Sequence, residues 1–104
     1  MSNISITLME ECDLEDVLEV SSLSLKDSWS KEAFKKELSN PLAKYLVAKE
    51  NNKVIGFAGV WTIVDEGHIT NIAVHPNFRG KGIGSILLSS LIEHKKIGVV
   101  TLLL

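Results

Sequence analysis

The chain has 104 residues, of which 45% are hydrophobic and 23% charged, and its formal net charge at pH 7 is −2. This length suits one small domain with one core, so we expect residues 1–104 to fold as a single unit. The balanced charge argues against a nucleic-acid binder or an anionic-membrane binder, because such proteins usually carry a basic face. No apolar run approaches the ~20 residues of a membrane span, and we expect no signal peptide. With Cys12 as the only cysteine, we expect a reducing, cytoplasmic compartment.

The N-terminal third predicts one strand and two helices. Apolar and polar residues alternate over 4–8, which is typical of a half-buried strand. Apolar residues at helical spacing predict a first helix over 14–24, with Asp13 as its N-cap. Ser30 is a second N-cap candidate, and it predicts a helix over 31–38.

Trp29 stands immediately before the second N-cap, and Phe34 is the fourth residue of the helix that follows. Apolar residues at these two positions form a hydrophobic staple, which fixes how the chain enters a helix. A ligand-binding role for Trp29 stays open beside this structural one.

The middle of the chain predicts an antiparallel meander. Strand-forming residues fill 45–48 and 54–61, and the Asn51-Asn52 pair between them predicts a hairpin turn because asparagine tolerates positive φ. Glycines 56 and 59 inside the second strand predict a bulge or a close backbone approach. A second turn is expected at Asp65-Glu66-Gly67, before a strand that ends at 71–74.

The stretch 79–85, Arg-Gly-Lys-Gly-Ile-Gly-Ser, follows that strand and a Pro-Asn pair, and it precedes a helical apolar pattern that ends near Lys95. Glycines at a helix N-terminus let a phosphate approach the free N–H groups. A P-loop is excluded because no glycine is followed by Lys and then Ser or Thr. A dinucleotide fingerprint fails because its last required glycine falls on Ser85.

The apolar run from Val99 to Leu104 predicts a final strand, parallel to the one before the glycine turn. The element order therefore indicates an α+β fold of three layers. Its mixed sheet would begin with the antiparallel meander and end with a strand–helix–strand unit.

The pattern Arg79-x-x-Gly82-x-Gly84, directly after a Val-x-Pro strand end, resembles the acyl-CoA pyrophosphate loop of the GNAT superfamily of N-acetyltransferases. Two further stretches, 28–48 and 65–74, are similar to the RimI group within it. That group acetylates the N-terminal alanine of a ribosomal protein.

The resemblance implies acetyl-CoA as acetyl donor, no metal, and an amine acceptor. The acceptor would be a protein N-terminus, such as that of a ribosomal protein, or a small amine, and Trp29 lies where acceptor sites are built. By the same resemblance, the backbone of Ile72, Ala73 and Val74 pairs with the pantetheine arm. The residues expected to hold the pyrophosphate are Arg79, Gly80, Lys81, Gly82, Ile83, Gly84 and Ser85.

The RimI group carries its catalytic base and acid after the strand that matches 99–104. By the resemblance these two residues would lie beyond Leu104, which implies a C-terminally truncated chain without the last helix and strands. Glu66 is the remaining candidate base, against the simpler interpretation of a solvated turn residue. An apolar edge strand at 99–104 predicts a homodimer. The alternative function is a non-catalytic acetyl-CoA-binding or assembly module of the same fold.

Overall fold

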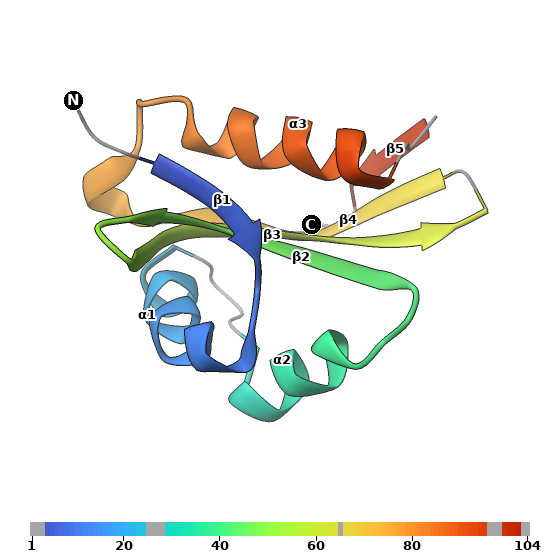
Figure 1. Cartoon of the computed structure of the whole chain (residues 1–104), viewed down its shortest axis with the longest axis horizontal. Coiled ribbons are helices and arrows are strands. Elements are labelled where there is room, and N and C mark those ends of the chain that lie inside the picture. The colour runs from blue at the N-terminus through green and yellow to red at the C-terminus, as the bar shows by residue number, and fades with distance from the viewer. Residues whose placement is uncertain (1–3, 25–28, 65, 96–98, 103–104) are drawn as a thin grey trace.

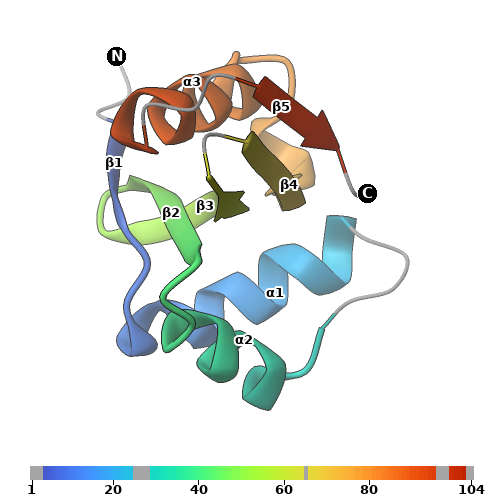
Figure 2. The ribbon, with the colours of Figure 1, turned by 90° about the vertical axis from the view of Figure 1, so that its right-hand side faces the viewer.

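The structure is a computed structural model of the chain, and it describes residues 4–24, 29–64, 66–95 and 99–102. The elements in chain order are β1 (Ile4–Leu8), the 3₁₀ helix η1 (Glu11–Asp13), α1 (Leu14–Ser24), α2 (Lys31–Leu38), β2 (Ala43–Glu50), β3 (Lys53–Ile63), β4 (Glu66–Val74), the 3₁₀ helix η2 (Pro76–Phe78), α3 (Ile83–Lys95) and β5 (Val99–Leu102). The strands form one sheet, with α3 on one face and α1 and α2 on the other (Figure 1, Figure 2). The predicted three-layer arrangement is confirmed.

The strand order in the sheet is β1-β2-β3-β4-β5. The first four strands pair antiparallel, whereas β5 pairs parallel to β4 after the crossover through α3. This is the predicted mixed sheet.

The last strand is shorter in the structure than the sequence predicted. We expected it to run from Val99 to Leu104, whereas β5 ends at Leu102. Leu103 and Leu104 lie outside the described residues, so the catalytic base and acid that the resemblance puts beyond Leu104 stay a prediction. β5 is an edge strand of the described sheet, and self-association through it likewise stays a prediction.

The entry to α2 is built as the sequence predicted. The Ala33 N–H donates to the Ser30 hydroxyl over 3.2 Å, which satisfies one of the free donors of the first turn. The rings of Trp29 and Phe34 lie 5.4 Å apart, so the hydrophobic staple is present. Phe34 is fully buried and anchors α2 to the sheet.

The start of α1 differs from the prediction. Asp13 is not its N-cap, because the chain makes the 3₁₀ turn η1 before the helix begins at Leu14. The Asp13 carboxylate instead accepts a hydrogen bond from the Glu10 N–H at 2.9 Å, and it lies 2.8 Å from the Lys49 ammonium on β2. The buried carboxylate therefore ties the turn to the sheet.

The turn between β3 and β4 also differs from the prediction. Glu66 and Gly67 belong to β4, and Glu66 pairs with Ile63. Only positions 64 and 65 connect the two strands, and position 65 lies outside the described residues. A two-residue hairpin needs positive φ, and Val64 adopts it at 58° with its side chain in solvent. The Asn51-Asn52 hairpin is confirmed, with φ of 53° and 65°.

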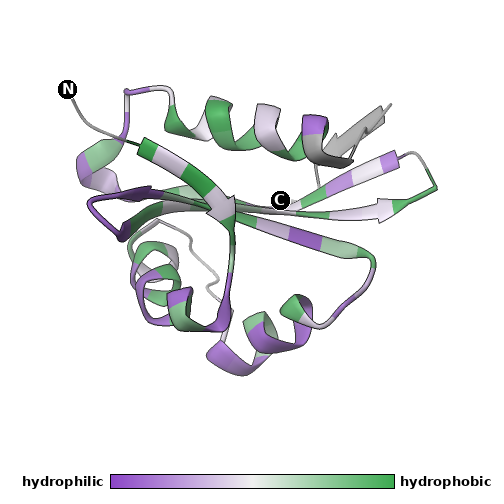
Figure 3. Cartoon of the chain, in the orientation of Figure 1, coloured by the Kyte–Doolittle hydropathy of each residue, from purple (hydrophilic) through white to green (hydrophobic). Residues whose placement is uncertain are grey.

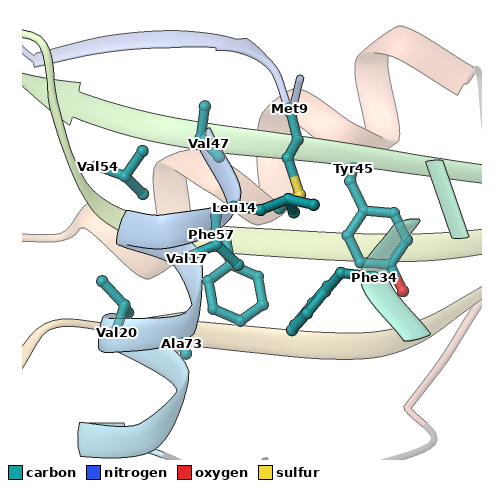
Figure 4. Close-up of a cluster of buried hydrophobic side chains, with 10 residues drawn as sticks. All are labelled: Met9, Leu14, Val17, Val20, Phe34, Tyr45, Val47, Val54, Phe57 and Ala73. Carbon is teal, nitrogen blue, oxygen red and sulfur yellow. The ribbon is translucent and has the colours of Figure 1, made fainter. Parts of the chain in front are cut away.

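The two faces of the sheet carry separate apolar clusters. The cluster beneath α1 and α2 is centred on Phe57, Phe34 and Tyr45 (Figure 4). The cluster beneath α3 includes Leu87, Leu91 and the strand residues that point the other way. Figure 3 shows the complementary pattern, with hydrophilic residues concentrated on α2 and on the hairpin between β2 and β3. Burial on both faces fixes the register of the central strands.

Both glycines of β3 meet the predicted requirement for close approach. A Cβ on Gly59 would lie 2.1 Å from the nearest ring atom of Tyr45. A Cβ on Gly56 would lie 3.1 Å from the Ala73 carbonyl oxygen. The Tyr45 ring therefore lies directly on the backbone of β3, in space that any other residue would fill.

We expect Gly59→Ala to destabilise the fold by roughly 3 kcal/mol or more, because overpacking a tight core forces side chains and backbone apart. Gly56→Ala is the matched control, since its contact is looser, and it should cost clearly less. Urea unfolding followed by circular dichroism measures both. Equal losses in the two variants would contradict the contact between Tyr45 and Gly59.

Candidate functional site

The first turn of α3 is open to solvent at its backbone. The Ile86 N–H donates to the Gly82 carbonyl at 3.1 Å and is the first helical donor, so the N–H groups of residues 83–85, which precede it, have no i−4 partner within the helix. Gly80 and Gly82 have φ of 80° and 76°, and a Cβ on either would meet nothing within 4 Å. This is the geometry that admits an anion to a helix N-terminus.

Two cations flank this turn. Arg79 and Lys81 are exposed, and neither forms an ion pair within the described part of the chain. The Arg79 Nε donates to the Val74 carbonyl at 3.2 Å, which orients the guanidinium and leaves its other N–H groups available. The Lys81 ammonium lies 5.4 Å from the centre of the Phe78 ring. The positive charge predicted here is therefore present and unneutralised.

The edge of β4 next to this turn is also unpaired. In the described residues, β5 pairs with β4 only over Glu66–Ile69, so 70–74 has no strand on that side. The Val74 carbonyl points to this edge, because it accepts hydrogen bonds from Ser24 and Arg79, while the next residue, His75, donates its N–H to Ile55 of β3. Backbone groups alternate along a strand, so the main chain of Ile72 faces the same edge, while that of Ala73 faces β3.

A bulge in β4 lies where the pairing with β5 ends. Gly59 pairs with Asn71 and Val60 pairs with Ile69, so Thr70 is an extra residue. Ile69 and Ile72 both pack toward α3, which leaves the side chains of Thr70 and Asn71 on the opposite face. A bulge re-aims side chains in this way and is frequent beside active sites.

Tyr45 completes a polar group at the bulge. Its hydroxyl lies 3.1 Å from the Thr70 hydroxyl, and the Asn71 amide donates to it over 3.5 Å. Burial raises the pKa of the Tyr45 phenol to about 12, while the hydrogen bond with Thr70 acts in the opposite direction. The phenol therefore stays protonated at neutral pH. No pattern in the sequence pointed to this group, because Tyr45 and Thr70 lie on different strands.

A cleft of about 380 Å³ opens on the same face, between α2 and β3. Its lining residues are Trp29, Ala33, Lys36, Glu37, Asn40 and Trp61. The Glu37 side chain is buried, and its carboxylate accepts hydrogen bonds from the Trp61 indole at 2.9 and 3.1 Å and from the Asn40 amide at 3.3 Å. Sequence reasoning identified Trp29 but missed Glu37 and Trp61, which only the fold brings together.

The predicted base Glu66 lies away from the polar group at the β4 bulge. It is the first residue of β4 and is exposed. Asn71 lies five positions further along β4, which corresponds to about 16 Å along a strand. A general base needs direct contact or one bridging water, so Glu66 could act on an amine at the bulge only through a chain of waters. Its catalytic role stays a prediction.

Among the described residues, no three His, Cys, Asp or Glu side chains are grouped so that they could hold a metal ion. No helix in the same part of the chain is long and apolar enough to cross a membrane.

The sequence model of the acetyltransferase (GNAT) family matches residues 13–100, which include the open turn, the β4 edge and the cleft. The chain belongs to this family. A GNAT relative named as the alanine N-acetyltransferase of ribosomal protein bS18, from Haemophilus influenzae, is 39% identical over 100 residues. That match covers 93% of this chain and 66% of the relative.

Two solved GNAT structures share the fold. The ribosomal-protein-S18-alanine N-acetyltransferase of Escherichia coli matches with a TM-score of 0.81 and 26% identity, over 90% of this chain and 60% of that one. The PaiA N-acetyltransferase of Thermoplasma acidophilum, in complex with coenzyme A, matches with a TM-score of 0.82 and 25% identity, over 90% and 72%. The chain spans between about half and two thirds of the length of the first two sequence relatives it matches, 54% and 66%.

Tyr45 is the only tyrosine of the chain, so its ionisation can be followed by the near-ultraviolet absorbance of tyrosinate. With a pKa of about 12, we expect about a tenth of it to be ionised at pH 11, against about nine tenths in the denatured chain. Because the unfolded state loses most of this proton between pH 10 and 12 before the folded state does, stability should fall there by up to about 1.4 kcal/mol per pH unit. Nine-tenths ionisation at pH 11 with native circular dichroism would contradict the buried position.

Proposed function

We propose that this chain binds acetyl-CoA and that its family's chemistry, transfer of the acetyl group to an amine, takes place at the β4 bulge. The observation that carries the proposal is the placement of the open α3 turn directly beside the unpaired edge of β4. A phosphate site and a free strand edge thus form one continuous surface.

The pyrophosphate would bind at the α3 turn. The free N–H groups of residues 83–85 and the helix dipole favour negative charge there. Gly80 and Gly82 leave the space that a ligand needs, and Arg79 and Lys81 supply cations. Ile83 contributes its main chain only, since its side chain is buried under α3.

The pantetheine arm would run along β4 as an added strand. Amide groups of an extended ligand can pair with an unpaired strand edge. Ile72 and Val74 face this edge, so we expect the main chain of Ile72 and the N–H of Val74 to form the hydrogen bonds, since the Val74 carbonyl already accepts from Ser24 and Arg79. Ala73 supports the strand from the other side through its pairing with Phe57.

The acetyl group would then reach the bulge. The acceptor nitrogen attacks the thioester carbonyl, the new C–N bond forms, and the C–S bond breaks. The acceptor starts as an ammonium, so it loses one proton to a base or to water before the attack and a second as the amide forms, and the leaving thiolate takes up one of the two. The polar group of Tyr45, Thr70 and Asn71 would lie where these charges change, and its protonated phenol could donate but not abstract a proton.

The acceptor we propose is the N-terminal α-amine of a protein, such as an alanine of a ribosomal protein. The relatives from Haemophilus influenzae and Escherichia coli carry that activity in their names. A small amine would react through the same kind of nitrogen atom, so it is the alternative acceptor. Trp29, on the face that holds the bulge side chains, would contact this acceptor.

We expect the chain to bind acetyl-CoA in a calorimetric titration and to lose that binding in Gly82→Asp. The substitution places a side chain and a negative charge where the pyrophosphate would lie. Ser89→Asp, on an exposed face of α3, is the control for the added negative charge and should bind normally. Bound ligand should stabilise the unmodified chain by about 2.7 kcal/mol at a hundredfold excess over Kd. If Gly82→Asp bound acetyl-CoA as tightly as the unmodified chain, the pyrophosphate would not lie at the α3 turn.

We expect acetyl transfer from acetyl-CoA to a peptide that begins with alanine, detected by mass spectrometry. The same peptide with a blocked α-amine is the control, and its modification would exclude the proposed acceptor atom. If Glu66 acts as the base, Glu66→Gln should slow transfer by about a hundredfold or more. Glu50→Gln, on β2, should leave the rate unchanged.

A further inference from the structure

We infer that the cleft between α2 and β3 binds a cationic side chain, a lysine or an arginine, next to the reacting amine of a peptide acceptor. This inference rests on the proposed function for the place of the amine. The cleft itself is defined by Trp29, Glu37 and Trp61, and its charge and shape can be tested without catalysis.

The first observation is a buried carboxylate without a cation among the described residues. Glu37 is 9% exposed, and its hydrogen-bond partners are the neutral indole of Trp61 and the neutral amide of Asn40. No lysine, arginine or histidine of the described residues forms an ion pair with it. A buried charge is stabilised mainly by an opposite charge. The carboxylate also has capacity for a further donor.

The second observation is the shape of the surroundings. Two indole rings and the methyl group of Ala33 line the cleft. Lysine and arginine side chains bury their apolar stems on such surfaces, and their charged ends favour the faces of tryptophan. An acidic ligand would be repelled by Glu37, and a purely apolar one would leave its charge unpaired. Charge and shape therefore both select a long cation.

The third observation is the distance to the bulge. Trp61 pairs with His68 across β3 and β4, and Thr70 lies two residues further along β4. One strand spacing and two residues of rise correspond to about 8 Å. The side chain of the residue after the reacting amine can span this gap. Tyr45 lies between the two places, with its ring on Gly59 and its hydroxyl at Thr70.

The charge of Lys36 predicts the direction in which the affinity for a cationic ligand changes when that charge is removed. It lines the same cleft from the exposed side of α2. Its ammonium would repel an incoming cation, so the affinity for such a ligand should rise when that charge is removed. The affinity for a neutral ligand should not change.

The test compares two tetrapeptides, Ala-Arg-Ala-Ala and the same sequence with citrulline, the uncharged analogue of arginine. Both tryptophans of the chain line the cleft, so their fluorescence reports its occupancy directly. We expect the arginine peptide to bind about tenfold more tightly, as one charge-assisted hydrogen bond predicts. Equal affinities for the two peptides would overturn the inference.

Variants assign the selectivity to Glu37. Glu37→Gln should reduce the tenfold preference to about one, and Glu32→Gln, the same change at an exposed position of α2, should retain it. Lys36→Gln should tighten the arginine peptide only. A preference that persists in Glu37→Gln, or a weaker arginine peptide in Lys36→Gln, would contradict the inference. The peptide comparison on the unmodified chain and the Lys36→Gln arm do not depend on the folding of Glu37→Gln.

The calorimetric titration with acetyl-CoA keeps this inference separate from the proposed function. Acetyl-CoA binding without peptide selectivity would refute the cleft and leave the function standing. Peptide selectivity without acetyl-CoA binding would leave a cation site on a chain that lacks the proposed activity.

Discussion

The contact between the Tyr45 ring and the backbone of Gly59 organises the polar group of Tyr45, Thr70 and Asn71 on the sheet face beneath α1 and α2. It places an aromatic ring against the backbone of β3 and brings the phenol hydroxyl to Thr70 of β4. There the bulge at Thr70 turns two successive side chains toward the same face, so the hydroxyl finds hydrogen-bond partners in a buried place. A buried polar group without partners would cost about 1–3 kcal/mol. The ring, the glycine and the bulge therefore stabilise one another.

The two edges of β4 have different neighbours. Along its length it pairs with β3, and this pairing is supported by apolar clusters on both faces. Its other edge is covered by β5, among the described residues, only over the first four positions. The remaining edge faces the N-terminus of α3, which is held against β4 through Arg79 and through the packing of Gly84 near Ile72 and Val74. An unpaired strand edge and an open helix start thus lie side by side, which suits a ligand that carries both amides and phosphates.

The two faces of the sheet carry different polar and charged groups. The α3 side presents positive charge and backbone donors at the surface. The α1 and α2 side presents the buried carboxylate of Glu37, two indoles and the neutral phenol of Tyr45. The proposed donor is an anion and the proposed acceptor carries an ammonium group, so each would meet charge of the opposite sign. Both proposed paths would converge at the bulge in β4.

Local pattern in the sequence determined much of this protein. Period-two and helical spacing predicted the strands and helices, the Asn51-Asn52 pair predicted the hairpin, and the spacing of Arg79, Gly82 and Gly84 predicted the helix start that suits a phosphate. These signals are short-range, since a cap, a turn or a glycine at positive φ depends on a few neighbouring residues. The role of Asp13 was mispredicted because a carboxylate can cap several backbone geometries. The bounds of the turn between β3 and β4 were mispredicted because the positive φ of Val64 is set by the pairing of the two strands. Tertiary structure alone decided that Glu37 and Trp61 line one cleft and that Tyr45 reaches Thr70. The first pair is separated by 24 positions in the sequence and the second by 25, so each pair meets only when the sheet and α2 pack together.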